Sequence, residues 1–266
     1  MTVFQAFVLG LVQGMAEFLP ISSSGFLILV PKLFGWQVQS LAFDAFLHIA
    51  TLTATITALW PEVKMMLKTL FLSKKEDQTS HEWRSLALWI VCALIPVALL
   101  GSLFQNFIEN NIRSERVVAL SLIIWGIVLY IADKRTVQRT GSVTNVGLKR
   151  AFLIGCAQVI ALIPGTSRSG ITITAGLFSG LSRETAARFS FLLAIPTVAA
   201  AGFFKLWDVI DGGSFIELAP LLVGFFTAAV SGFLTVRFLL QFLKRSTFSE
   251  FAIFRILIGV FILLFI

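Results

Sequence analysis

The sequence AFVLGLVQGMAEFLPISSSG at residues 6–25 recurs, without a gap, as AFLIGCAQVIALIPGTSRSG at residues 151–170. Eight of the twenty aligned positions are identical, whereas chance would give about one or two matches, so the chain contains an internal duplication. The copies differ where chemistry is expected: Glu17 has an apolar counterpart, and Ser23 aligns with Arg168. One half of the duplication therefore supplies an acidic residue and the other supplies a basic residue.

The duplication extends beyond this stretch of sequence. Residues 43–60 parallel residues 189–207, and Gly126 in a later apolar segment matches Gly259 in another. We therefore predict two repeats joined by a linker. Their bounds are 1–133 for repeat one, 134–147 for a cytoplasmic linker and 148–266 for repeat two.

The composition restricts the fold class. Apolar residues make up 57% of the chain and charged residues 13%, and the mean hydropathy is +0.92. Such a composition cannot be arranged around one water-facing globule, so we predict an all-α polytopic membrane protein with a single membrane domain. Six stretches approach the roughly 20 residues that span a hydrocarbon core: 43–60, 86–107, 117–132, 189–206, 219–236 and 251–266.

Two further apolar regions are interrupted by polar turns. Pro20 and the serine cluster 22–25 divide the first, and residues 164–170 divide the second. Each region should form a re-entrant pair, in which one helix enters the membrane and breaks, and a second helix returns. Non-helical backbone at membrane depth must be surrounded by protein or a water-filled cavity, so the breaks should lie inside the molecule. One re-entrant pair and three spans per repeat give an odd number of crossings, so the second repeat should have inverted topology.

The loop charges predict the orientation. Fifteen Lys and Arg residues fall on one side of the predicted spans, against four on the other, Lys32, Arg113, Arg116 and Lys205. Positively charged loops face the cytoplasm, so both termini and the first re-entrant pair should open to the outside. The net charge of +7 is then explained by loops that face anionic lipid, and no nucleic-acid partner is expected.

An acid and a base lie at the predicted breaks. Gln13 and Glu17 are four residues apart, so their side chains share one helix face. A carboxylate inside a membrane is costly and is a functional candidate by default, as is a buried Arg168. The alternative is a structural carboxylate that pairs with Arg168.

Arg168 has the surroundings of an anion site. Its planar guanidinium suits phosphate oxygens, and the hydroxyls of Ser167, Ser169 and Thr172 flank it. The turn that contains Gly170 begins a predicted helix, whose N-terminus adds backbone amides and a positive dipole end. The pattern favours binding of a phosphate or pyrophosphate.

The segments QGMAEFLPISSSG, PGTSRSG and ARFSFLLAIP resemble the signature segments of the undecaprenyl-pyrophosphate phosphatase family of the bacitracin-resistance type. The resemblance implies a hydrolase of the bacterial inner membrane that removes the terminal phosphate of undecaprenyl pyrophosphate and recycles the lipid carrier. It also implies an inverted-repeat fold with re-entrant helices, an active site that opens to the periplasmic face, and a divalent cation, Mg²⁺ or Ca²⁺. Bacitracin would compete with the enzyme for the polyprenyl pyrophosphate substrate. The resemblance does not decide between a monomer and a homodimer.

The resemblance also implies roles for particular residues. The glutamate motif of the family falls on Gln13 and Glu17, which would hold the metal, and its essential arginine falls on Arg168. Its serine motif provides Ser23 as a candidate catalytic residue. The implied pyrophosphate-binding residues lie in the two turns and the following helix: Ser22, Ser24, Gly25, Ser167, Ser169, Gly170 and Thr172.

Two positions depart from the family pattern. Gln13 occupies a position that is Glu in some members. Phe26 stands where many members have a histidine with an assigned catalytic role, and phenylalanine cannot transfer a proton. His48, on the next predicted span, is therefore a candidate substitute, although a packed histidine is an equal alternative.

A hypothesis for the chemistry follows. The metal and Arg168 would stabilise the charge of the phosphoryl-transfer transition state, and water or Ser23 would attack the terminal phosphorus, with Glu17 or His48 as base. The main rival is a lipid-phosphate flippase or anion carrier, because transporters also use inverted repeats with broken helices. Lipid phosphatases of the acid-phosphatase type are disfavoured, because no histidine follows His81.

Overall fold

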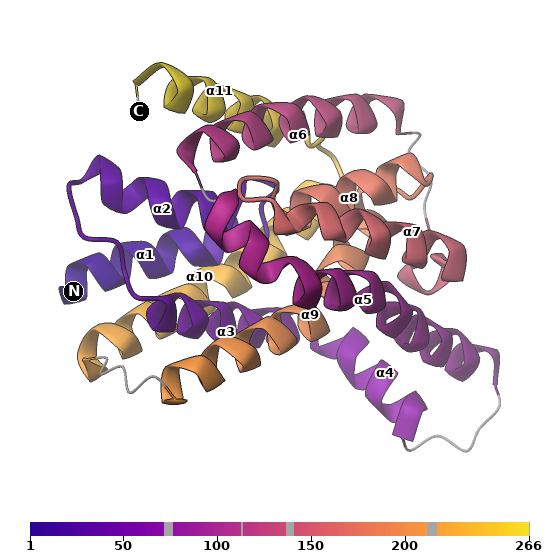
Figure 1. Cartoon of the computed structure of the whole chain (residues 1–266). Helices are drawn as coiled ribbons and strands as arrows, with labels where there is room; N and C mark the ends of the chain where they lie inside the picture. The colour runs from indigo at the N-terminus through magenta and orange to yellow at the C-terminus, as the bar shows by residue number, and fades with distance from the viewer. Residues whose placement is uncertain (72–76, 113, 137–140, 212–216, 266) are drawn as a thin grey trace.

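The structure is a computed structural model that describes residues 1–71, 77–112, 114–136, 141–211 and 217–265 (Figure 1). Within these ranges the chain forms helices and connecting loops, with no strand, which confirms the all-α prediction. The helices are α1 Val3–Ala16, α2 Ser23–Leu33, α3 Leu41–Ala58, α4 Trp60–Phe71, α5 Gln78–Asn111, α6 Glu115–Arg135, η1 Val143–Asn145, α7 Leu148–Gln158, η2 Val159–Leu162, α8 Arg168–Phe178, α9 Arg183–Asp211, α10 Leu218–Phe242 and α11 Ser249–Phe265.

Five described helices are long and apolar enough to cross a membrane, namely α3, α5, α6, α9 and α10. The sixth predicted span corresponds to α11, whose 17 described residues are at the lower end of the range that can cross, about 17 to 25. The protein is therefore a multi-pass membrane protein, as the composition predicted. Helix α4 was not predicted; it buries Val63, Met66 and Thr69 along one face, at the spacing of three residues expected of an amphipathic helix.

Both interrupted regions form broken helix pairs. Helices α1 and α2 are separated at residues 17–22, and α7 with η2 is separated from α8 at residues 163–167. Figure 1 shows that the two pairs point toward each other from opposite ends of the molecule, with both breaks near its middle. The breaks therefore lie inside the molecule, as the need to shield irregular backbone from lipid requires.

The two breaks share an unusual backbone geometry. Ser22 and Ser167, which are equivalent in the duplication, have φ angles of 80° and 72°. Such angles are disfavoured for residues with a side chain, and local hydrogen bonds must compensate for them. The Ser167 hydroxyl accepts the backbone N–H of Gly170 at 3.1 Å, and the hydroxyls of Ser22 and Ser24 lie 3.3 Å apart.

Equivalent glycines allow close helix crossings. A Cβ at Gly10 of α1 would lie 2.5 Å from the carbonyl oxygen of Gly224 on α10, and one at Gly155 of α7 would collide with Ala93 on α5. In the same way, Gly126 of α6 and Gly259 of α11 leave no space for a side chain where these two helices cross. Small residues at helix contacts are how membrane helices obtain close packing.

The substitution Gly10→Ala should destabilise the fold, because its Cβ would meet backbone atoms that cannot move away independently. Overpacking of this kind costs about 1–3 kcal/mol, and the thermal midpoint in detergent should fall by roughly 2–10 °C for a chain of this size. Gly101→Ala is the matched control, since its Cβ would meet only a side-chain carbon of Leu162 at 3.7 Å. Equal midpoints for the two variants would contradict the prediction.

Candidate active site

The acidic residue and the basic residue predicted from the duplication, Glu17 and Arg168, meet at the centre of the molecule. Glu17 follows the last residue of α1, where its backbone N–H still donates to the Gln13 carbonyl oxygen. An Nη2 of Arg168, at the start of α8, donates to Glu17 Oε1 at 2.8 Å. Glu17 is buried, with 6% of its side chain exposed, and Arg168 is largely buried, with 14% exposed. Charges removed from water to this degree need a partner, and each provides the partner for the other.

Three further predicted residues surround the second oxygen of Glu17. Glu17 Oε2 accepts the Ser23 hydroxyl at 2.8 Å and the Gln13 side-chain amide at 3.1 Å. His48 Nε2 lies 3.8 Å from the same oxygen. The carboxylate therefore joins residues from α1, α2, α3 and α8 in one cluster, which we call the Glu17 cluster: Gln13, Glu17, Ser23, His48 and Arg168.

The orientation of His48 is fixed by its other nitrogen. Its Nδ1 lies 2.7 Å from the backbone carbonyl oxygen of Asp44, and a carbonyl can only accept a hydrogen bond. The Nδ1–H therefore donates to this carbonyl oxygen, and Nε2 is the nitrogen that faces Glu17.

Arg168 is also held by α9. Its Nη1 donates to the Ser190 carbonyl oxygen at 3.1 Å, and the Ser190 hydroxyl lies 2.7 Å from that of Thr172. The hydroxyl of Thr172 also donates to the Arg168 carbonyl oxygen at 2.8 Å. Thr172 and Ser190 therefore position the Arg168 segment. Ser190 was missed as a site residue, although it lies in the segment ARFSFLLAIP that carried the family resemblance.

The remaining predicted pyrophosphate-binding residues lie around the cluster without contacting Glu17. Ser169 donates across to the Leu19 carbonyl oxygen at 3.2 Å and so links the two breaks. Ser167 and Ser169 lie 3.2 Å apart, whereas Ser24 is exposed. The glycines 25 and 170 are buried in the first turns of α2 and α8.

Phe26 packs against α11. Its ring stacks on that of Phe254, with centroids 6.0 Å apart and an interplanar angle of 8°. Residue 26 thus makes an apolar contact in this chain, and the imidazole near Glu17 is that of His48. The other histidine, His81, is exposed at the start of α5.

Arg255 of α11 is a further residue that the sequence analysis missed. It is completely buried, and it donates to carbonyl oxygens of both breaks: Pro20 at 3.1 Å, Gly165 at 3.1 Å and Thr166 at 2.7 Å. The signal was present in the sequence as a single arginine inside the predicted span 251–266.

Glu17 and Gln13 are the residues of the site that offer oxygen ligands to a hard divalent cation. The described residues contain no cluster of three or more His, Cys, Asp or Glu side chains, so a metal would need other oxygen ligands. Gln13 Oε1 is buried without a hydrogen-bond partner beside the Glu17 carboxylate. Mg²⁺ and Ca²⁺ prefer oxygen ligands, and Mg²⁺ in particular is commonly held by one or two carboxylates together with substrate phosphates.

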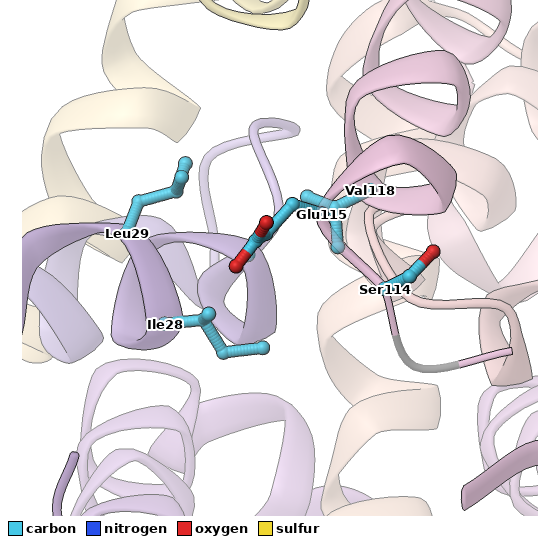
Figure 2. A pocket seen from close by; sticks show the side chains of 6 residues that line it. Ile28, Leu29, Ser114, Glu115 and Val118 are labelled. Atoms are coloured by element: carbon cyan, nitrogen blue, oxygen red, sulfur yellow. The ribbon is translucent and has the colours of Figure 1, made fainter. Parts of the chain in front are cut away.

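A cavity of about 280 Å³ lies beside α2, between this helix and the start of α6. Figure 2 shows Glu115 of α6 reaching toward α2 between Ile28 and Leu29. Glu115 also pairs with Lys32. Gly25, Ile28 and Leu29 follow the spacing of one helix face, and Ser23 lies about 200° around the helix from Gly25. None of the residues of the Glu17 cluster lines this cavity.

The chain matches one family over nearly its whole length. The family model described as "Bacitracin resistance protein BacA" matches residues 6–261. A Chlorobium phaeovibrioides protein named "Undecaprenyl-diphosphatase" is 42% identical, over 99% of this chain and 97% of its own length.

Two more relatives carry the same name. One, from Hahella chejuensis, is 42% identical over 97% of this chain and 96% of its own length. Another, from Elusimicrobium minutum, is 41% identical over 99% of this chain and 98% of its own length. Because the matched region contains both breaks and every residue of the Glu17 cluster, the chain belongs to the bacitracin resistance protein family, BacA.

Proposed function

We propose that this protein is an undecaprenyl-diphosphatase of the bacterial plasma membrane. It hydrolyses undecaprenyl pyrophosphate to undecaprenyl phosphate and inorganic phosphate, and so recycles the lipid carrier of cell-wall synthesis. The observation that carries the proposal is the convergence of Glu17 and Arg168, 151 residues apart in sequence, at 2.8 Å inside a membrane protein. The names of the full-length relatives support it.

The active site is proposed to lie between two inverted repeats, 1–133 and 148–266. The helix contacts support this arrangement, because the packing of α1 on α10 has a counterpart in that of α7 on α5, while α3 packs on α9 and α6 on α11. Both termini lie at the end of the molecule where α1 enters (Figure 1). We propose that this end faces the periplasm, because few of the loop cations lie there. Arg113, one of the four outer cations, lies outside the described residues.

Arg168 binds the pyrophosphate in the proposed mechanism. Its guanidinium can form two parallel hydrogen bonds to phosphate oxygens, and it neutralises the charge that develops on the bridging oxygen as the bond to undecaprenyl phosphate breaks. A divalent cation held by Glu17 and Gln13 would supply further neutralisation of the substrate charge.

Ser23 is the nucleophile in this proposal. Its hydroxyl already donates to Glu17 Oε2 at 2.8 Å, which is the geometry of a nucleophile with its base. Ser23 Oγ bonds to the terminal phosphorus, its proton passes to Glu17, and undecaprenyl phosphate leaves. Water then attacks the phosphoserine phosphorus and gives a proton to His48 Nε2, while Glu17 returns its proton to Ser23 Oγ as the P–Oγ bond breaks and inorganic phosphate is released.

Arg168→Ala should reduce phosphate release from a polyprenyl pyrophosphate by at least 100-fold, because the phosphoryl transition state loses its cation. Purified protein in detergent is the sample, and Arg237→Ala, on an exposed position of α10, is the control. Bacitracin added to the parent reaction should also lower the rate by sequestering the substrate. Transport of the lipid without phosphate release would instead support a flippase.

Phe26→His should raise activity less than about twofold, because the side chain at position 26 stacks on Phe254 and His48 already faces Glu17. His48→Ala should lower kcat by about 10² to 10⁴, the usual contribution of a general base. Both variants are compared with the parent in the same phosphate-release assay. Large activation by Phe26→His, together with full activity of His48→Ala, would refute the assignment of His48.

Chelation of divalent cations should abolish phosphate release, and Mg²⁺ or Ca²⁺ should restore it. Gln13→Glu should then lower the metal concentration that gives half-maximal activity, since it adds a second carboxylate beside Glu17. Gln158→Glu is the matched control, because Gln158 is the equivalent of Gln13 in the second copy and is also buried. Four residues after Gln158 the chain has Leu162, so this variant adds no second carboxylate beside an existing one. An unchanged metal requirement in Gln13→Glu would remove Gln13 from the metal site.

A further inference from the structure

Arg255 lies in an unusual environment for a cation. It occupies α11, a helix of otherwise apolar residues after its first turn, and its side chain is completely buried. The ion pairs of the described residues do not include Arg255. A buried charge without a carboxylate must be stabilised by hydrogen bonds, and in a membrane protein it is a functional candidate by default.

The hydrogen bonds of Arg255 join the two breaks. One Nη donates to Pro20, which lies midway between Glu17 and Ser23 in the first break. The other Nη donates to Gly165 and Thr166, which directly precede the turn that carries Arg168. One planar guanidinium therefore fixes the separation of the two segments that carry the acid and the base.

Two glycines make room for this side chain. A Cβ at Gly170 of α8 would lie 2.8 Å from Arg255 Nη1, and a Cβ at Gly126 of α6 would lie 3.0 Å from Arg255 Cγ. A side chain at either glycine would therefore occupy space that the Arg255 side chain fills on its way to the breaks. Gly170 also belongs to the turn SRSG, residues 167–170, which carries Arg168. The space for Arg255 and the active site are therefore formed in part by the same turn.

We infer that Arg255 is a positioning residue for the phosphatase reaction: its guanidinium holds the Glu17 and Arg168 segments in the relative position that phosphoryl transfer requires. The inference rests on the proposed function. An arginine suits this task because its fork of donors is planar and rigid, so it can bind carbonyls of two segments at once. A lysine has a single ammonium at the end of a flexible stem and cannot fix the distance between them.

The test compares Arg255→Met and Arg255→Lys with the parent protein in detergent, with Arg237→Met on the exposed face of α10 as the matched control. Two readouts are needed: the kinetics of phosphate release, and hydrogen exchange of peptides that cover residues 17–25 and 160–170. The thermal midpoint and elution profile establish which variants are folded.

We expect Arg255→Met to lower kcat at least 10-fold while KM changes less than threefold, because a displacement of about 1 Å in a catalytic group can cost 10²-fold. Amide exchange should become faster in both breaks and stay unchanged in the peptides of α3. Arg255→Lys should lower kcat at least fivefold, since it keeps the charge but not the fork. If Arg255→Met does not fold, Arg255→Lys decides the question by the same two readouts.

Parent-like kcat in Arg255→Lys would overturn the inference, because charge alone would then suffice. Loss of activity in Arg255→Met with unchanged exchange in both breaks would also overturn it, since the arginine would then act on the substrate directly. If the parent protein releases no phosphate, the proposed function fails. Hydrogen exchange alone then decides whether Arg255 holds the two breaks together.

Discussion

The structure depends on one constraint: two helices break inside a membrane protein, and the backbone groups exposed by each break must find hydrogen-bond partners within the protein. An unsatisfied amide or carbonyl in hydrocarbon costs several kcal/mol. Serine hydroxyls supply some of the partners, as at Gly170. Arg255 supplies others, by donating to three carbonyl oxygens from both breaks. The same interactions hold the two halves of the molecule together at their centre.

The breaks also create the conditions for chemistry. Glu17 and Arg168 leave their helix ends at the point where the chain is irregular, and burial makes each dependent on the other. In water such a pair contributes little, but burial makes the loss of either partner costly and so keeps the two side chains together. The duplication explains the asymmetry, because the two copies have the same backbone turn, with positive φ at Ser22 and Ser167, but carry different side chains on it.

Much of this arrangement could be predicted from local sequence. The apolar stretches, the polar interruptions and the duplicated turn predicted the helical membrane fold and both breaks, with Glu17 and Arg168 located at them. The direct ion pair between Glu17 and Arg168 is the alternative that the sequence left open. Three features could not be predicted in this way. Ser190 and Arg255 act through hydrogen bonds to residues distant in sequence, which leave no periodic pattern, and the packing of Phe26 on Phe254 depends on where α11 lies.

The sequence by itself determined the class of protein, the place of each break and the residue types available there, because hydropathy, turn residues and duplication are local properties of the chain. Only the tertiary structure decided which groups touch: Ser23, Gln13 and His48 converge on one carboxylate oxygen, whereas Ser24 is exposed and Thr172 supports Arg168. The physical reason is that hydrogen bonds act over about 3 Å. Partners at that range are set by how helices distant in sequence pack, and close packing depends on residues such as Gly10 and Gly155.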